Sequence, residues 1–143
     1  MVTAVDVLVH LRRSRDLIDA RYAEPLDLAT MAAEAGFSRY HFAREFKSAY
    51  GEPPGAYLSR RRVERAKDLL ANANLTVTEI CQVVGFSSLG SFSSRFTELV
   101  GCPPSEYRRR VVERGGPPAI PGCIAMLWAR NPGEGTRPDE GLA

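Results

Sequence analysis

Basic side chains gather at two places in this chain of 143 residues. A guanidinium group can donate two parallel hydrogen bonds to a phosphate or to the edge of a guanine base. Phosphate binding depends on such local clusters more than on the total charge, which is only +2 here. Either cluster alone could equally be a solvated helix face, so its meaning depends on the elements that carry it. The clusters consist of Arg60, Arg61, Arg62, Arg65 and Lys67, and of Arg108, Arg109 and Arg110.

Side chains suited to catalysis or metal binding are sparse. His10 and His41 are the two histidines, and no Ser-His-Asp, Cys-His or metal-ligand spacing surrounds them. The cysteines Cys81, Cys102 and Cys123 form no CxxC pair, which is typical of unpaired thiols in a reducing cytoplasm. We therefore expect no enzyme activity, no metal and no cofactor. With no signal-peptide pattern and no apolar run of about 18 residues, we expect a cytoplasmic protein.

A repeat of about 50 residues organises the chain. The triplet at residues 36–38, Gly-Phe-Ser, recurs 49 positions later at residues 85–87. Six further residues recur 50 positions later, and agreement at so many aromatic, Gly and Pro positions indicates two copies of one structural unit. These residues are Phe42, Phe46, Gly51, Pro53, Pro54 and Tyr57, matched by Phe92, Phe96, Gly101, Pro103, Pro104 and Tyr107.

Each copy has the pattern of a helix, a tight turn and a second helix. In the first copy the helices cover about 27–35 and 38–50, and the turn glycine suits a left-handed backbone. In the second copy Thr76 or Thr78 can cap the first helix, and Ser87 or Ser88 the second. The paired phenylalanines lie four apart on one helix face, which predicts core positions. Cys81 lies where two helices cross and is predicted to be a small buried side chain.

A single helix over about 54–72 is predicted between the copies, with Pro54 at its start and an apolar stripe along it. An opening helix over about 5–22 is expected to pack on the first unit through Val5, Leu8, Val9, Leu17 and Ile18. A closing helix covers about 104–113, and no segment has the pattern of a strand. We predict an all-α fold of about seven helices in residues 1–112, with units at about 5–52 and 75–112. A Gly/Pro-rich tail follows at 113–143.

These residues resemble the signature of the AraC/XylS family of regulators over about residues 6–111. The most specific stretch runs from Gly85-Phe86-Ser87-Ser88 to Tyr107. The resemblance implies a seven-helix module that binds double-stranded DNA. The two tandem units make binding as a monomer to an asymmetric site the default expectation. Two recognition helices, about 38–50 and 88–100, would enter successive major grooves, usually to activate transcription, and RNA polymerase is a possible partner. The linking helix, about 27 Å long, suits two reading helices roughly 34 Å apart.

The first recognition helix carries the better candidates for contacts to DNA. Once its core-facing phenylalanines are set aside, Tyr40, Ala43 and Arg44 face outward near its start and are predicted to contact bases. Arg44 is the candidate for a bidentate contact to guanine. Ser38, Arg39 and Lys47 are predicted to reach phosphates.

The second recognition helix departs from the family pattern, which usually has a basic residue where Ser94 stands. Its readout is therefore expected to rest more on phosphates and DNA shape. Arg60, Arg61, Arg62 and Arg108 are further phosphate candidates, although some of the arginines must pair with Glu64, Asp68 or Glu106. The outward residues predicted to contact bases are Ser88, Leu89, Gly90, Ser93 and Ser94, and those predicted to contact phosphates are Ser87 and Arg95.

Two alternatives remain open. The serine-rich second helix also suits a protein-interaction module that binds RNA polymerase or another regulator with weak DNA specificity. The tail carries an apolar segment at 119–129, which either folds back onto the module or forms a docking patch. Because the chain has no room for a separate sensor domain, we expect control through abundance or a partner.

Overall fold

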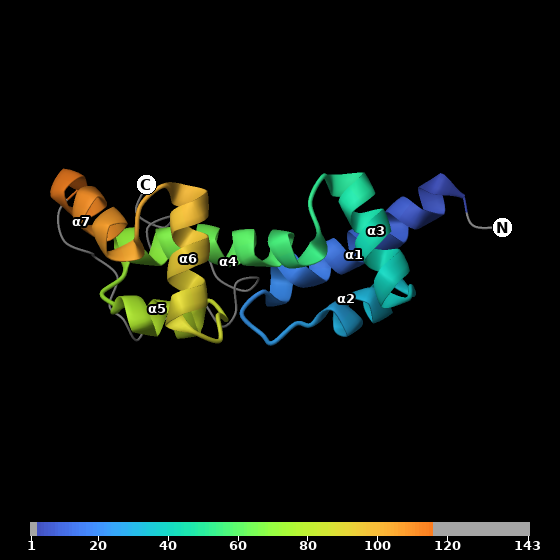
Figure 1. Cartoon of the computed structure of the whole chain (residues 1–143), viewed down its shortest axis with the longest axis horizontal. Coiled ribbons are helices and arrows are strands. Elements are labelled where there is room, and N and C mark those ends of the chain that lie inside the picture. Colours follow the sequence, from blue (N-terminus) through green and yellow to red (C-terminus); the bar gives the residue numbers. More distant parts are fainter. Residues whose placement is uncertain (1–2, 116–143) are drawn as a thin grey trace, which may run out of the picture.

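The computed structural model describes residues 3–115, and within that range it contains seven α-helices and no strand. The predicted all-α fold with a long central helix is confirmed, and Figure 1 shows α4 joining two groups of helices at its ends. The predicted tail at 113–143 lies almost entirely outside the described residues. The helices are α1 (Ala4–Arg21), α2 (Leu28–Ala35), α3 (Arg39–Tyr50), α4 (Pro54–Asn72), α5 (Val77–Val83), α6 (Leu89–Val100) and α7 (Pro104–Gly115).

Hydroxyl and carboxylate side chains fix where several helices begin. An N-cap oxygen accepts a hydrogen bond from one of the backbone N–H groups that the first helical turn leaves unpaired. Ser38 caps α3 in this way, and Ser88, not Ser87, caps α6. Thr76, not Thr78, caps α5, because Glu79 bonds back to the Thr76 backbone N–H and completes a capping box.

The repeat in the sequence is a repeat in the structure. Two separate apolar cores form, one among α1, α2, α3 and the start of α4, and one among the rest of α4 with α5, α6 and α7. The ring centroids of Phe46 and Tyr57 lie 5.6 Å apart at an interplanar angle of 70°. The ring centroids of Phe96 and Tyr107 show the same 5.6 Å and 70°. The predicted core role of the phenylalanines is confirmed.

Helix α4 serves both units with different parts of its length. Tyr57 and Leu58 near its start belong to the first core, and Val63, Ala66 and Leu69 further along belong to the second. One continuous helix with intact backbone hydrogen bonds resists bending far more than a loop would. The two units are therefore joined by a stiff element and not by a flexible linker.

The expected packing of the opening helix was wrong at its N-terminal half. Val5, Leu8 and Val9 are 69%, 50% and 49% exposed. The face turned toward α2 carries Ser14, whose hydroxyl donates a 2.8 Å hydrogen bond to the Met31 carbonyl, and Ile18, which is fully buried. The small serine lets α1 approach the backbone of α2, and this contact sets which face of α1 is buried.

Tyr57 should make the stability of the protein depend on pH in the alkaline range. Its side chain is buried, and its hydroxyl donates a 2.6 Å hydrogen bond to the Asp19 carboxylate. Burial, together with this bond, raises the pKa of Tyr57 to about 12. The unfolded chain ionises near pH 10, so the stabilisation is complete below about pH 10 and is lost as the pH rises through about 12. Between these values we expect Tyr57 to lower the free energy of unfolding by about 1.4 kcal/mol per pH unit.

Urea unfolding between about pH 8 and 12 measures this dependence. The Tyr57→Phe variant removes the ionisable group, so its free energy of unfolding should fall less steeply above pH 10 than that of the wild type. Tyr22 and Tyr107, whose pKa values burial also raises, remain in both proteins and cancel in the comparison. Parallel curves for the two proteins would contradict the assignment to Tyr57.

No helix among the described residues is long and apolar enough to span a membrane.

Candidate nucleic-acid interface

The predicted recognition helices α3 and α6 occupy equivalent places in the two units. In Figure 1 α6 crosses α4, whereas α3 lies beside the N-terminal end of α4 and crosses α1, and both helices run from the lower edge of the molecule to the upper edge. Their N-terminal turns therefore lie along the same edge. In a helix-turn-helix these turns are the part that meets base edges in a major groove.

The exposed face of α3 combines a cation with an aromatic ring. The Tyr40 side chain is 79% exposed, and the Arg44 guanidinium lies 5.9 Å from the centroid of its ring. The Arg44 side chain is 63% exposed, with its Nε 3.8 Å from Glu45. Ala43, the neighbour of Arg44 in the helix, is half-buried. An extended arginine beside a small residue and an aromatic ring can reach into a groove and contact base edges.

The residues predicted to contact phosphates lie at the margins of this face and are exposed. Arg39 and Lys47 are exposed at the first and third turns of α3. Ser38 is exposed too, but its hydroxyl oxygen already accepts the capping bond from the His41 N–H. The His41 ring packs against Phe37, with centroids 4.6 Å apart at an interplanar angle of 44°, and its Nε2 lies 3.6 Å from a carboxylate oxygen of Glu45.

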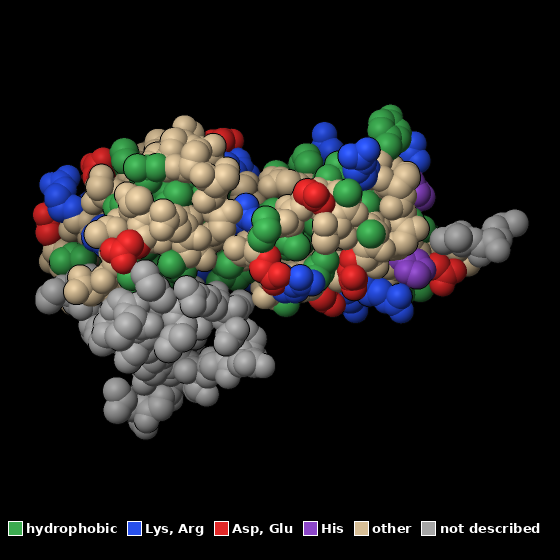
Figure 2. Space-filling model, turned by 90° about the horizontal axis from the view of Figure 1, so that it is seen from below, with side chains coloured by type: hydrophobic (Ala, Val, Ile, Leu, Met, Phe, Trp, Pro, Cys, Tyr) green, Lys and Arg blue, Asp and Glu red, His purple; other side chains and the backbone are tan. Residues whose placement is uncertain are grey.

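The corresponding face of α6 has little charge. Leu89 is 45% exposed, Gly90 and Ser94 are exposed, and Ser93 is half-buried. Figure 2 looks onto the lower edge of the molecule and shows mainly uncharged surface over this unit, with Lys and Arg more frequent over the first. The Ser88 hydroxyl caps the helix and donates to the Ser91 hydroxyl, so it is partly occupied. Ser87 is exposed beside it.

Arg95 is held against α4 and is not extended toward the groove-facing edge. Its Nε donates a 2.8 Å hydrogen bond to the Ser59 hydroxyl, and its Nη2 donates a 3.3 Å bond to the Ala56 carbonyl. Its Nη1 pairs with Glu98 at 3.0 Å. The side chain is only 21% exposed. This arginine therefore ties α6 to the N-terminal half of α4.

The arginines of α4 are also engaged within the protein. Arg60 pairs with Glu52 at 2.7 Å and with Glu64 at 2.8 Å. Arg61 pairs with Glu64 as well, and its Nε lies 3.1 Å from Asp19. The pairing with Glu64 was among the partners expected from the sequence. Salt bridges at a half-exposed surface are weak, so these two side chains can exchange a carboxylate for a phosphate at small cost.

Arg62 and Arg108 have a role that the sequence did not reveal. Arg62 donates 2.7 Å and 2.9 Å hydrogen bonds to the carbonyls of Tyr22 and Glu24. Arg108 donates 3.1 Å and 3.2 Å bonds to the carbonyls of Leu70 and Ala73, at the end of α4. Burial lowers the pKa of both guanidinium groups. No feature of residue type or spacing separates these two arginines from their neighbours.

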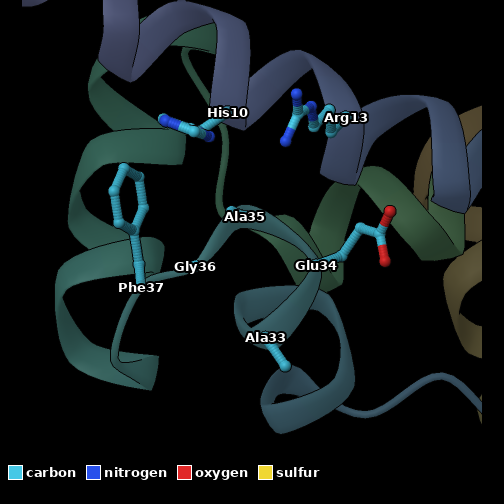
Figure 3. Close-up of a pocket in the computed structure, with 7 residues that line it drawn as sticks. All are labelled: His10, Arg13, Ala33, Glu34, Ala35, Gly36 and Phe37. Carbon is cyan, nitrogen blue, oxygen red and sulfur yellow. The ribbon is translucent and has the colours of Figure 1, made fainter.

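A pocket of about 410 Å³ lies between α1 and the turn that joins α2 to α3. Figure 3 shows His10 and Arg13 on one side and Glu34 and Phe37 on the other. These residues include no nucleophile beside an acid-base partner. Among residues 3–115, no group of His, Cys, Asp and Glu side chains could hold a metal ion. Cys81 and Cys102 are buried free thiols, and burial raises the pKa of Cys81, as expected for a packing residue.

Comparison with known proteins places this architecture in a family. Residues 31–110 match the model described as a helix-turn-helix domain. The transcriptional activator AarP of Providencia stuartii is 35% identical over 91 residues, which cover 64% of this chain and 67% of AarP. A solved transcriptional regulator with an AraC-type DNA-binding domain, from Chromobacterium violaceum, is 30% identical with a TM-score of 0.67, covering 74% of this chain and 95% of that one. The chain belongs to the AraC/XylS family.

Two further relatives are a transcriptional regulator and a DNA-binding domain. The regulator ExsA of Pseudomonas aeruginosa is 31% identical over 100 residues, which cover 70% of this chain but only 36% of ExsA. The DNA-binding domain of AdpA, solved in complex with a target DNA, is 31% identical with a TM-score of 0.70, covering 73% of this chain and 94% of that domain. ExsA and AarP, two relatives of this AraC/XylS family member, are transcriptional regulators.

Proposed function

We propose that this protein is a sequence-specific DNA-binding transcriptional regulator that inserts α3 and α6 into successive major grooves. The observation that carries the proposal is the equivalent placement of these two helices in their units, with their N-terminal turns on one edge of the molecule. The related AdpA domain was solved in complex with a target DNA, which supports DNA binding by this fold.

In this proposal α3 supplies most of the direct readout. Arg44 donates to the O6 and N7 atoms of a guanine, which is the most frequent specific contact in major grooves. Tyr40 and Ala43 offer apolar contacts to a thymine methyl group beside it. Arg39 and Lys47, at the margins of the same face, bind phosphates and fix the register of the helix on the duplex.

In this proposal helix α6 contacts the bases mainly through uncharged side chains. Leu89 offers an apolar contact, and Gly90 lets the backbone approach the bases closely. The hydroxyls of Ser93 and Ser94 can donate a hydrogen bond to a base acceptor or accept one from a base donor. Such contacts discriminate weakly, so we infer that this half of the site depends more on DNA shape. Ser87 and backbone N–H groups at the start of α6 supply phosphate contacts. Arg60 and Arg61 can add phosphate contacts from α4.

We further propose that the protein binds an asymmetric site as a monomer and activates transcription, with RNA polymerase as the partner. The two units already differ in their reading faces, so one chain suffices for an asymmetric site. The names of the related AarP and of VirF of Yersinia enterocolitica describe activators, which favours activation over repression.

Selection of bound sequences from a random DNA pool at about 150 mM salt tests the proposal. The wild type should enrich a motif of two parts about one helical turn apart. Arg44→Ala should weaken one guanine position in one part, by about 1–3 kcal/mol of discrimination. Ser94→Arg should sharpen the other part, because it restores a long donor on α6.

Arg109→Ala is the matched control for loss of one positive charge. Arg109 lies on α7 and is 65% exposed, so its removal should leave the motif unchanged. If the wild type enriches no motif and binding follows ionic strength alone, the proposal fails.

The second candidate function is a protein-interaction module that binds RNA polymerase or another regulator. The uncharged face of α6, with Leu89 exposed, is the observation that favours it. In that case Leu89→Asp should abolish capture of the partner, while the weak DNA binding should not change beyond about twofold.

A further inference from the structure

The two units touch each other directly, away from the shared core positions of α4. Gly85, at the turn of the second unit, has a positive φ of 98°. A Cβ atom built on it would lie 2.9 Å from the carbonyl oxygen of Ala23, in the loop between α1 and α2 of the first unit, and 3.0 Å from the Arg62 Nε. The equivalent glycine of the first unit, Gly36, has nothing within 4 Å of such an atom. The close approach therefore belongs to a contact between the units and not to the repeated motif.

Arg62 holds this contact together. Its guanidinium donates to the Tyr22 and Glu24 carbonyls on either side of Ala23, and its carbon lies 5.8 Å from the centroid of the Phe86 ring. One side chain of α4 thus binds the loop of the first unit and lies over the turn of the second. The two bonded carbonyls lie 40 and 38 residues away in the sequence, so these bonds fix tertiary geometry and do not stabilise α4 locally.

A second arginine, Arg95, also connects the second unit to the first part of α4. The contacts of Arg62 and Arg95 together are called the junction. Arg95 of α6 binds the Ala56 carbonyl and the Ser59 hydroxyl in the first two turns of α4, close to the first unit. The second unit is therefore held at two separate places. Two attachment points and a stiff helix remove the rotation that a single helix would still allow.

We propose that Arg62 is a positioning residue that sets the distance and angle between α3 and α6, and thereby the spacing of the two half-sites that the protein accepts on DNA. This inference rests on the proposed function. A rigid pair of binding elements gains affinity only on DNA whose half-sites match their separation, whereas a loose pair tolerates several separations and gains less on each. A phosphate contact by Arg62 would instead raise affinity equally at every spacing.

The test on DNA uses duplexes that carry the two selected half-sites with zero, one or two base pairs added or removed between them. The wild type should prefer one spacing by roughly tenfold or more. Arg62→Gln should reduce that preference to about threefold or less and leave affinity for each single half-site within about twofold. Arg62→Lys keeps the charge but cannot donate along two fixed directions, so its preference should also fall.

Arg60→Gln is the matched control. It removes the same charge two positions away, but its partners Glu52 and Glu64 lie outside the junction. Its affinity should fall by a similar factor at every spacing, without a change in the preferred one. The same uniform loss in Arg62→Gln would overturn the inference and assign Arg62 to phosphate binding.

A measurement without DNA separates this inference from the proposed function. Spin labels at Ser48→Cys on α3 and Ser105→Cys on α7, both exposed positions, report the distance between the units in a full chain whose native cysteines are replaced by alanine. We expect a narrow distance distribution that broadens in Arg62→Gln but not in Arg60→Gln. If the wild type selects no DNA motif but the distance distribution broadens in Arg62→Gln, the proposed function fails. The role of Arg62 in fixing the two units relative to each other is then still supported. An unchanged distribution in a folded Arg62→Gln protein would overturn the junction itself.

Discussion

Replacing Phe96 with alanine should lower the free energy of unfolding by about 3–5 kcal/mol. Phe96 is fully buried in the core of the second unit, and its ring contacts those of Phe92 and Tyr107. Truncation removes the buried aromatic surface and leaves a cavity that the flanking rings cannot fill without moving. Because the two cores share no residue, the loss should be concentrated in α5, α6 and α7. Urea unfolding gives the magnitude, and amide hydrogen exchange gives the location.

Two variants make this expectation specific. Leu99→Ala changes a residue of the same helix that is 39% exposed, and it should cost less than about 1 kcal/mol. Phe46→Ala, the equivalent change in the first unit, should cost as much as Phe96→Ala but remove exchange protection from α1, α2 and α3 instead. Equal loss of protection in both units from either variant would show that the two cores unfold as one.

Gly85→Ala should destabilise the protein by about 2–4 kcal/mol and disturb the junction between the units. Two costs add at this position. The left-handed backbone, with φ of 98°, is strained for any residue with a Cβ atom. The new methyl group would also meet the backbone of Ala23 at 2.9 Å, and a backbone atom cannot rotate away as a flexible side chain can.

Gly36→Ala isolates the second cost. Gly36 has φ of 75° and open space around it, so its replacement should cost about 1–2 kcal/mol from backbone strain alone. Thermal unfolding of both variants measures the difference. Equal losses of stability in the two variants would mean that the loop of the first unit moves aside for the methyl group at no cost. The close approach of Gly85 to Ala23 would then not contribute to stability.

The asymmetry between the units bears on how the site is read. A repeat has kept its core residues and its caps, while the exposed faces of its second helices have diverged in charge. Packing restricts which residue types fit at core positions. Exposed positions have no such restriction, so their residue types can differ between the units to suit different DNA sequences. The charged exposed face of α3 and the uncharged reading face of α6 therefore agree with a proposed site whose two halves differ in sequence and in mode of readout.

Local pattern was enough to determine the elements of this protein. The helical spacing of apolar residues, the capping hydroxyls and the turn glycines predicted every helix of residues 3–115 to within a few positions, and the bounds of α4 were those predicted. The internal repeat predicted which phenylalanines form the cores. These features depend on interactions within a few residues along the chain, so the sequence carries them directly.

Only the tertiary structure decided what each arginine does and which face of α1 is buried. Arg62, Arg95 and Arg108 look like their neighbours in the sequence, yet the fold brings carbonyls 35 to 40 residues away within reach of their guanidinium groups. Val9 and Ile18 look alike too, and the contact of Ser14 with α2 determined that only Ile18 is buried. The physical reason is that a long polar side chain or an apolar face takes whatever partner the assembled backbone offers, and that partner is set by distant residues.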